Sequence, residues 1–139
     1  MAHPDLDQLV NFCLQFSRHQ LKRRGRFHPF AATLKTGGTI SPLAAHTNDE
    51  NPSGDALIHD LANVIRSLTA SGDADAVAIC YDGRVLEAGI QKAKRDAITV
   101  ALEHRNGESV SVYLPYAKKL FGYRYEPMIA AAKERRFFD

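Results

Sequence analysis

The chain has 139 residues, of which 45% are hydrophobic and 24% are charged, and its formal net charge is only +2. This composition excludes a disordered chain, and no apolar run approaches the ~20 residues of a membrane-spanning helix. A small net charge does not by itself indicate a nucleic-acid or membrane partner. The length predicts one α+β domain over residues 1–139. The apolar run at 9–16 is short and follows two aspartates, so we expect no export signal and a cytoplasmic location.

The first predicted element is a helix from Pro4 to Arg24. Proline suits the first helical turn, apolar residues recur at helical spacing, and Gly25 is a C-terminal stop signal. The apolar arc of this helix runs from Phe12 round to Leu14 and spans about 200°, which is more than a helix on one surface needs. Either other elements pack against two sides of this helix, or part of the helix contacts another subunit.

A hairpin and a second helix follow along the chain. The hairpin is predicted over residues 27–43, with its turn at Thr36-Gly37-Gly38, because a Gly-Gly pair supplies the positive φ angles of a tight turn. Residues 44–54 have the composition of a loop. The second helix is predicted from Pro52 or Ser53 to residue 70, because apolar residues gather on one face and polar residues on the other.

The C-terminal half reads mainly as strands. Residues 76–81 are apolar on both faces, which is typical of a central strand, and this strand either turns at Asp82-Gly83 or continues to Leu86. Residues 89–95 form a polar loop. A further strand is predicted over 120–125, and Pro127 is expected to open a short helix from Met128 to Arg135.

A second hairpin is predicted from residues 96–105 and 108–116, which flank the strong turn signal Asn106-Gly107. With a two-residue turn, Arg105 faces Glu108 and Glu103 faces Val110. Alternation then places Glu103 and His104 on opposite faces, and both faces are apolar enough to be covered.

These elements predict an α+β fold in the order α-β-β-α-β-β-β-(β)-α. We expect a single antiparallel sheet of five to six strands, with two main helices and a short C-terminal helix.

Motifs for chemistry are missing from the sequence. Cys13 and Cys80 lie in apolar surroundings and are interpreted as core residues. The six histidines show no metal-ligand spacing, and there is no nucleophile elbow or phosphate-binding loop. The sequence therefore predicts no metal, no cofactor and no catalytic residue.

Basic residues are the only charge feature that stands out. The main cluster, a candidate anion-binding surface, comprises Arg18, Lys22, Arg23, Arg24 and Arg26. A second group is Lys92, Lys94 and Arg95, and a third is Lys118 with Lys119. Cations at the end of a helix are common and mildly stabilising, so a solvated helix terminus is favoured over a nucleic-acid interface.

A family resemblance rests on five short segments. They are Phe27-His28-Pro29-Phe30-Ala31, Ala76-Val77-Ala78-Ile79, Asp96-Ala97-Ile98, Leu102-Glu103-His104-Arg105-Asn106-Gly107 and Pro115-Tyr116. The pattern resembles a family of small bacterial proteins without assigned function and covers most of residues 26–116. The resemblance implies a bacterial cytosolic origin and carries over no catalytic residue. In its light, His28, Glu103 and Tyr116 are the positions to test first. The order of elements is also similar to roadblock and profilin-like domains, which are mostly dimerising scaffolds.

The sequence alone thus identifies no function. We expect a non-catalytic interaction or scaffold domain that forms a homodimer, because catalytic groupings are missing and the first helix has excess apolar surface. One alternative is a small enzyme or ligand-binding protein with a site at His28, Glu103 and Tyr116. The other is nucleic-acid binding through the cluster from Arg18 to Arg26.

Overall fold

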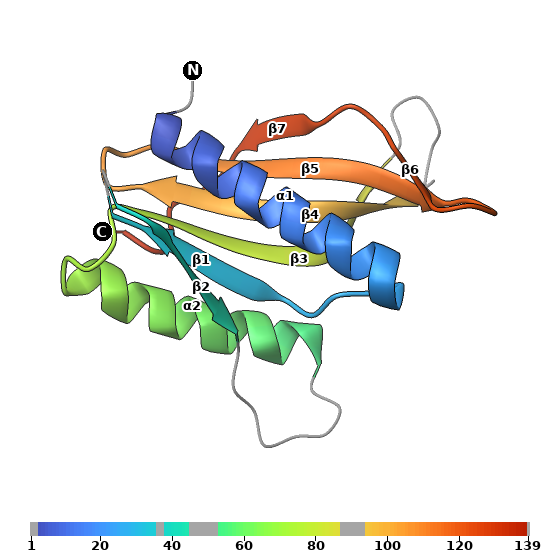
Figure 1. The fold of residues 1–139 in the computed structure, drawn as a ribbon. Coiled ribbons are helices and arrows are strands. Elements are labelled where there is room, and N and C mark those ends of the chain that lie inside the picture. The colour runs from blue at the N-terminus through green and yellow to red at the C-terminus, as the bar shows by residue number, and fades with distance from the viewer. Residues whose placement is uncertain (1–2, 36–37, 45–52, 87–93, 139) are drawn as a thin grey trace.

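The computed structural model describes residues 3–35, 38–44, 53–86 and 94–138. These residues form two helices and an antiparallel sheet of seven strands (Figure 1). The predicted α+β class with one antiparallel sheet and two main helices is confirmed, with more strands than the five or six expected. The elements are α1 (Pro4–Arg24), β1 (Phe30–Leu34), β2 (Ile40–Ala44), α2 (Gly54–Ala70), β3 (Ala76–Leu86), β4 (Lys94–His104), β5 (Ser109–Lys118), β6 (Tyr123–Tyr125) and β7 (Ile129–Ala132).

The strands lie in the order β2-β1-β3-β4-β5, and β6 and β7 both pair with β5 at the far edge of the sheet. The strand β3 runs without a break from Ala76 to Leu86, so the chain does not turn at Asp82-Gly83. The turn of the first hairpin, the loop at 44–54 and the polar loop at 89–95 fall wholly or largely outside the described residues. None of the described helices is long and apolar enough to cross a membrane.

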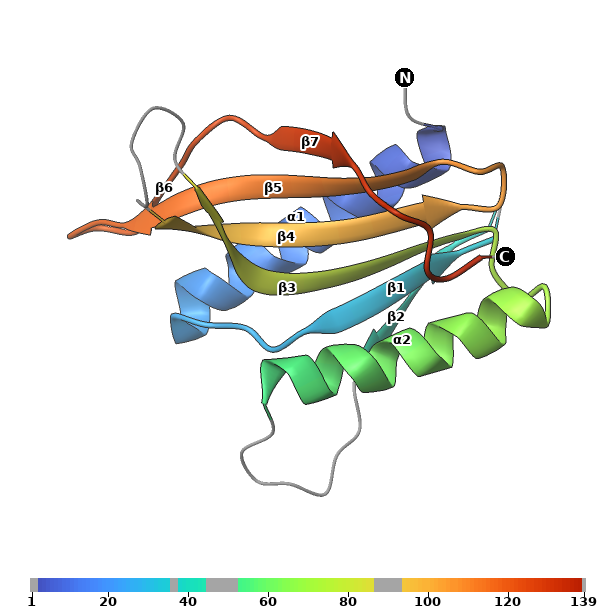
Figure 2. The same cartoon turned by 180° about the vertical axis from the view of Figure 1, so that it is seen from behind.

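The two helices cover opposite faces of the sheet, α1 diagonally across one face and α2 along the other (Figures 1 and 2). The alternation of β3 shows the division, since Ala78 and Cys80 pack towards α1 while Val77 and Ile79 pack towards α2. The segment that follows β7 also covers the α2 side of the sheet, where it crosses in front of the strands in Figure 2 and ends beside α2. The sheet is therefore buried on both sides.

Most of the wide apolar arc of α1 is covered by the sheet of the same chain. Its buried apolar residues are Leu6, Leu9, Val10, Cys13, Leu14 and Leu21. Phe12 is partly buried against this core, and Phe16 stays 41% exposed while its ring meets Phe30 edge-on at 4.8 Å. The arc therefore leaves little apolar surface on α1 for another subunit.

The register of the β4–β5 hairpin differs from the prediction by one residue. The N–H of Gly107 donates to His104 O at 3.0 Å, and Gly107 has a φ of 111°, so the loop has three residues and closes with a glycine bulge. Glu103 consequently faces Ser109 and not Val110. The prediction that Glu103 and His104 point to opposite faces is confirmed, because it depends only on alternation within β4.

The predicted C-terminal helix at 128–135 is wrong, because residues 129–132 form the strand β7. The sequence there has good helix formers, but local propensity is weak beside tertiary contacts. Pairing with β5 satisfies backbone groups that a helix would leave open at the edge of the sheet, and residues beyond β7 are bound by a buried side chain described below.

Gly83 is needed where β3 passes Thr99 of β4. A Cβ at residue 83 would lie 2.6 Å from the Oγ1 of Thr99, which is 1% exposed and hydrogen-bonded to Ala97 O. We expect Gly83→Ala to lower the free energy of unfolding by about 1–3 kcal/mol. In a Thr99→Ala background the same change should cost less, because the clashing oxygen is gone. Urea unfolding of the four proteins measures this, and equal costs in both backgrounds would contradict it.

Candidate functional site

Glu103 is a fully buried carboxylate that binds the segment after β7. Its oxygens accept the backbone N–H groups of Arg136 at 2.7 Å, Phe137 at 3.0 Å and Phe138 at 3.2 Å, and the Nζ of Lys133 at 2.5 Å. All four donors lie within residues 133–138, although Glu103 is 30 positions or more away in the sequence. The buried charge is therefore paired and hydrogen-bonded, as burial of an ion requires.

The segment held by Glu103 also packs against α2. Phe137 and Phe138 are buried with Leu61 and Ile65 of α2, and Thr69 Oγ1 donates to Phe137 O at 2.5 Å. Apolar contacts and backbone hydrogen bonds thus fix residues 133–138 on the face of the sheet, and they fix the direction in which β7 leaves β5.

The charge state of Glu103 follows from this environment. Burial raises the pKa of its carboxyl, but the Lys133 ammonium and three backbone N–H groups lower it by more, so the pKa lies below its ordinary value. Burial lowers the pKa of Lys133 in spite of the ion pair, and the nearby charges of Arg136 and Arg135 act in the same direction. The ionised carboxylate is the form that the folded chain favours.

We expect acid to weaken this attachment. A carboxyl with a lowered folded pKa contributes stability that is complete above its unfolded pKa of about 4.3 and is lost as the pH falls through its folded pKa. The free energy of unfolding should therefore begin to fall below about pH 5 and continue to fall to about pH 3, and it should fall less in a Glu103→Gln variant. Urea unfolding across this range measures the difference, and parallel pH profiles for the two proteins would contradict the role given to Glu103.

The strand β7 is an open edge. It pairs with β5 on one side, no described strand pairs with its other side, and all four of its residues are exposed. The N–H of Lys133 donates to Ser109 O at 3.3 Å, so alternation turns the amide of Ala131 towards β5 and those of Ala130 and Ala132 outwards. An exposed apolar strand with outward amides is a template for pairing with another strand.

The opposite edge of the sheet is protected. The outermost strand there is β2, and it contains Pro42, which has no amide hydrogen to offer. The strand β7 has no proline and no charged residue from Ile129 to Ala132. Residues 129–132 therefore lack both of these common guards against pairing.

Exposed large apolar side chains occur at two places along this side of β5. Among the described residues, four of the six lie between positions 120 and 129. Leu120 and Phe121 are each 91% exposed at the tip of the β5–β6 hairpin, and Met128 and Ile129 are 56% and 48% exposed at the start of β7. The hairpin tip lies beyond Lys118, whereas β7 pairs with β5 at residues 110–113, so only Met128 and Ile129 lie at the end of β7. Exposed apolar side chains beside an open strand mark an interaction surface more often than isolated ones do. We call the strand β7, together with Met128 that precedes it, the β7 edge.

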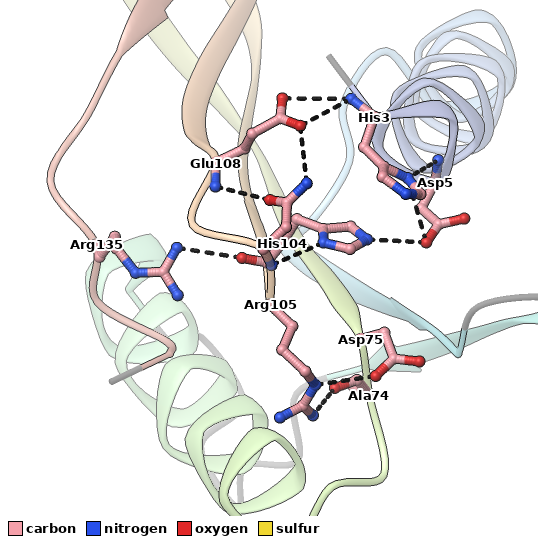
Figure 3. Close-up of polar contacts among 9 residues, drawn as sticks. His3, Asp5, Ala74, Asp75, His104, Arg105, Glu108 and Arg135 are labelled. Carbon is pink, nitrogen blue, oxygen red and sulfur yellow. Dashed lines mark hydrogen bonds and ion pairs between the residues drawn. The ribbon is translucent and has the colours of Figure 1, made fainter.

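A polar cluster ties the start of α1 to the β4–β5 turn (Figure 3). His104 Nε2 lies 2.9 Å from Asp5 Oδ2, and its Nδ1 accepts the N–H of Asn106 at 3.0 Å. The His3 ring stacks on the His104 ring at 4.1 Å, and the His3 N–H donates to Glu108 Oε1 at 3.1 Å. These residues are up to 105 positions apart, so no sequence spacing could indicate the cluster.

His3, Asp5 and His104 are close enough to hold a metal ion, but their hydrogen bonds do not favour one. The Nδ1 of His104 accepts a backbone N–H, so its Nε2 carries the hydrogen and donates to Asp5. The Nδ1 of His3 accepts the N–H of Asp5 at 3.0 Å and caps α1. Both imidazole lone pairs are engaged by backbone amides, and the cluster fits a structural lock better than a metal centre.

The structure does not bring together the three residues singled out from the sequence. His28 is exposed between α1 and β1, and it lines a cavity of about 500 Å³ with Arg24 and Arg26. Glu103 faces the α2 side of the sheet, whereas Tyr116 belongs to the core on the α1 side. They do not form one site.

Tyr116 has a structural partner of its own. Its hydroxyl donates to Asp82 Oδ1 at 2.7 Å. Burial first, and then the bond to the Asp82 carboxylate, raise the pKa of Tyr116. Burial also raises the pKa of Asp82, and the Tyr116 bond only partly offsets it. The pair joins β5 to β3 across β4.

The basic cluster surrounds the C-terminal end of α1. Lys22, Arg23 and Arg24 form its last turn, and Arg18 lies 4.6 Å from the centre of the Tyr125 ring. Arg26 is exposed after the helix. This arrangement matches cations at the negative end of a helix dipole. Of the second basic group, Lys92 lies outside the described residues.

Comparison with protein-family models, with curated proteins and with solved structures finds no match. The family resemblance of residues 26–116 therefore stays a prediction, and function has to be inferred from the geometry of this chain.

Proposed function

We propose that this protein is a non-catalytic interaction domain that forms a homodimer by pairing the β7 edges of two copies. The observation that carries the proposal is the edge itself, which is apolar, exposed and free of proline or charge from Ile129 to Ala132. Joined in this way, the two sheets would form one continuous antiparallel sheet, as strand addition at an open edge does elsewhere.

A second copy is the occupant that fits the edge best. Antiparallel pairing about a two-fold axis is self-complementary, because each copy offers the same donors and acceptors. Only residues with outward amides form doubly bonded pairs, so Ala130 would face either Ala130 or Ala132 of the second copy. The alanine side chains allow close approach, and Met128 and Ile129 then lose solvent contact at either end of the interface.

The contacts of the buried polar groups support a non-catalytic role. The buried carboxylates Glu103 and Asp5 bind parts of their own chain, and the hydroxyl of Tyr116 is held by Asp82. Each of these groups joins two elements of the described chain. Cys13 and Cys80 are buried free thiols, which supports a reducing compartment such as the cytoplasm.

Sedimentation equilibrium at micromolar concentration tests the proposal. The wild-type chain should have the mass of a dimer, and a double variant Met128→Ser, Ile129→Ser should dissociate more readily, since it removes exposed apolar side chains from the end of β7. Val64→Ser is the matched control, because Val64 is 48% exposed on α2, outside the β7 edge. A monomeric wild type, or equal weakening by the control, would contradict the proposal.

A further inference from the structure

We propose that the cavity between α2 and the C-terminal segment is a binding site for a small molecule that carries phosphate or diphosphate. The cavity measures about 440 Å³ and is lined by four arginines, which are Arg66, Arg105, Arg135 and Arg136. They come from α2, from the β4–β5 turn and from the segment after β7, so only the fold assembles them. This site does not depend on the dimer.

Positive charge at this cavity greatly exceeds its local compensation. Within the described residues, Arg66, Arg135 and Arg136 have no carboxylate at salt-bridge distance, and only Arg105 does, with Asp75 Oδ1 at 3.0 Å from its Nε. Lys133 adds a fifth cation nearby, but it is paired with Glu103. The chain as a whole has a net charge of only +2, so this is a local concentration that an anion would relieve.

Aromatic rings hold the cations in place. The guanidinium carbons of Arg105 and Arg135 lie 5.3 and 5.5 Å from the centre of the Phe138 ring, and that of Arg136 lies 5.7 Å from the centre of the Phe137 ring. Arg135 also donates to His104 O, a contact that Figure 3 shows, and Arg105 donates to Ala74 O. The guanidinium groups of Arg105 and Arg135, which are held by both a ring and a hydrogen bond, have less freedom to lose when a ligand binds.

Part of the donor capacity of these arginines remains for a ligand. A guanidinium has five N–H donors, and the described residues accept a single bond from Arg135 and none from the side chain of Arg136. Arg66 donates to Arg136 O and to Asn63 Oδ1. A planar guanidinium group with free N–H donors matches the oxygens of a phosphate group. Several guanidinium groups together suit a ligand with more than one negative charge.

The size of the cavity selects among anionic ligands. A volume of about 440 Å³ is in the range of sites for small molecules. The backbone N–H groups of Phe137 and Phe138 are held by Glu103, and the buried rings of both residues line the cavity. A small organic phosphate or diphosphate is the chemistry that fits these features.

Titration calorimetry with inorganic pyrophosphate, at constant ionic strength, tests the site. We expect saturable binding by the wild-type chain and at least about tenfold weaker binding by the double variant Arg66→Gln, Arg136→Gln, which removes two charged donors. The backbone N–H of Arg136 that Glu103 binds remains in this variant. The matched control is Arg23→Gln, Arg24→Gln, which removes the same charge from the end of α1.

Every outcome of this experiment either supports or contradicts the proposed anion site. Weakening by the Arg66, Arg136 variant but not by the control supports the site, provided that circular dichroism shows both variants folded. If folding fails, the single variant Arg136→Gln replaces the double variant, because its side chain makes no hydrogen bond to the described residues. Absence of binding at millimolar pyrophosphate, equal weakening by the control, or sulfate binding as tightly as pyrophosphate would overturn the proposal.

Discussion

Replacing Glu103 by Gln should lower the free energy of unfolding by about 3–5 kcal/mol. The neutral amide keeps the shape of the side chain, but one of its two oxygens becomes an NH₂ group. That group would face either the backbone N–H of Arg136 and the Nζ of Lys133, or the backbone N–H groups of Phe137 and Phe138, all of which are donors. Donors that are buried without an acceptor bear the full cost of their desolvation. Urea unfolding at one protein concentration measures the loss.

Glu134→Gln is the control for this prediction. Glu134 is exposed in the same segment, and its side chain accepts no hydrogen bond from the described residues, so its replacement should change the free energy of unfolding by less than about 0.5 kcal/mol. Similar small losses in both variants would show that the carboxylate of Glu103 does not hold the C-terminal segment.

Replacing Ala130 by Pro should convert the dimer into a monomer at micromolar concentration. The amide of Ala130 points away from β5, so proline removes no hydrogen bond within the chain, while it takes a donor from the edge and places a ring where a second strand would pair. The dissociation constant should rise at least about 100-fold, with little change in the stability of the monomer. Sedimentation velocity over a concentration series measures the shift.

Ala130→Ser is the matched control, because serine keeps the backbone amide and is similar in size. It should leave the dissociation constant within about threefold of the wild-type value. If both variants stay dimeric, the two copies meet elsewhere, and if both dissociate, the side chain of Ala130 and not its amide is what matters.

The helices and most strands could be predicted from the sequence because their signals are local. The helix at 4–24 has a proline at its start and a glycine at its end, and both lie where the sequence indicated. The helix ending at residue 70 has a compact apolar face. Turn signals also placed the β4–β5 hairpin, but the choice between a two- and a three-residue loop depends on the backbone of Gly107, which composition does not reveal.

The functional surfaces could not be predicted because they depend on contacts between distant residues. The sequence from Met128 to Arg135 favours a helix. Pairing with β5 makes residues 129–132 a strand instead, and the carboxylate of Glu103 binds the residues that follow. Glu103 was singled out, but as a possible site residue beside His28 and not as an anchor. Arg66 and Arg136 are 70 positions apart, so no charge cluster in the sequence indicated the cavity.

One side chain therefore connects the two proposed surfaces. Glu103 fixes residues 133–138, and this segment leads from the β7 edge on one side of the sheet to the arginine cavity beside α2 on the other. Residues 133–138, which lie between the two surfaces, are thus positioned by the buried carboxylate of Glu103 on β4.

Amide hydrogen exchange at Ala130 and Ala132 tests the dimer most directly. Both amides point away from β5, so only a strand from a second copy can protect them. We predict that their protection rises with protein concentration, while Ala131, whose amide faces β5, is protected throughout. Fast exchange of Ala130 and Ala132 at every concentration, with Ala131 still protected, would show that the β7 edge stays unpaired in solution.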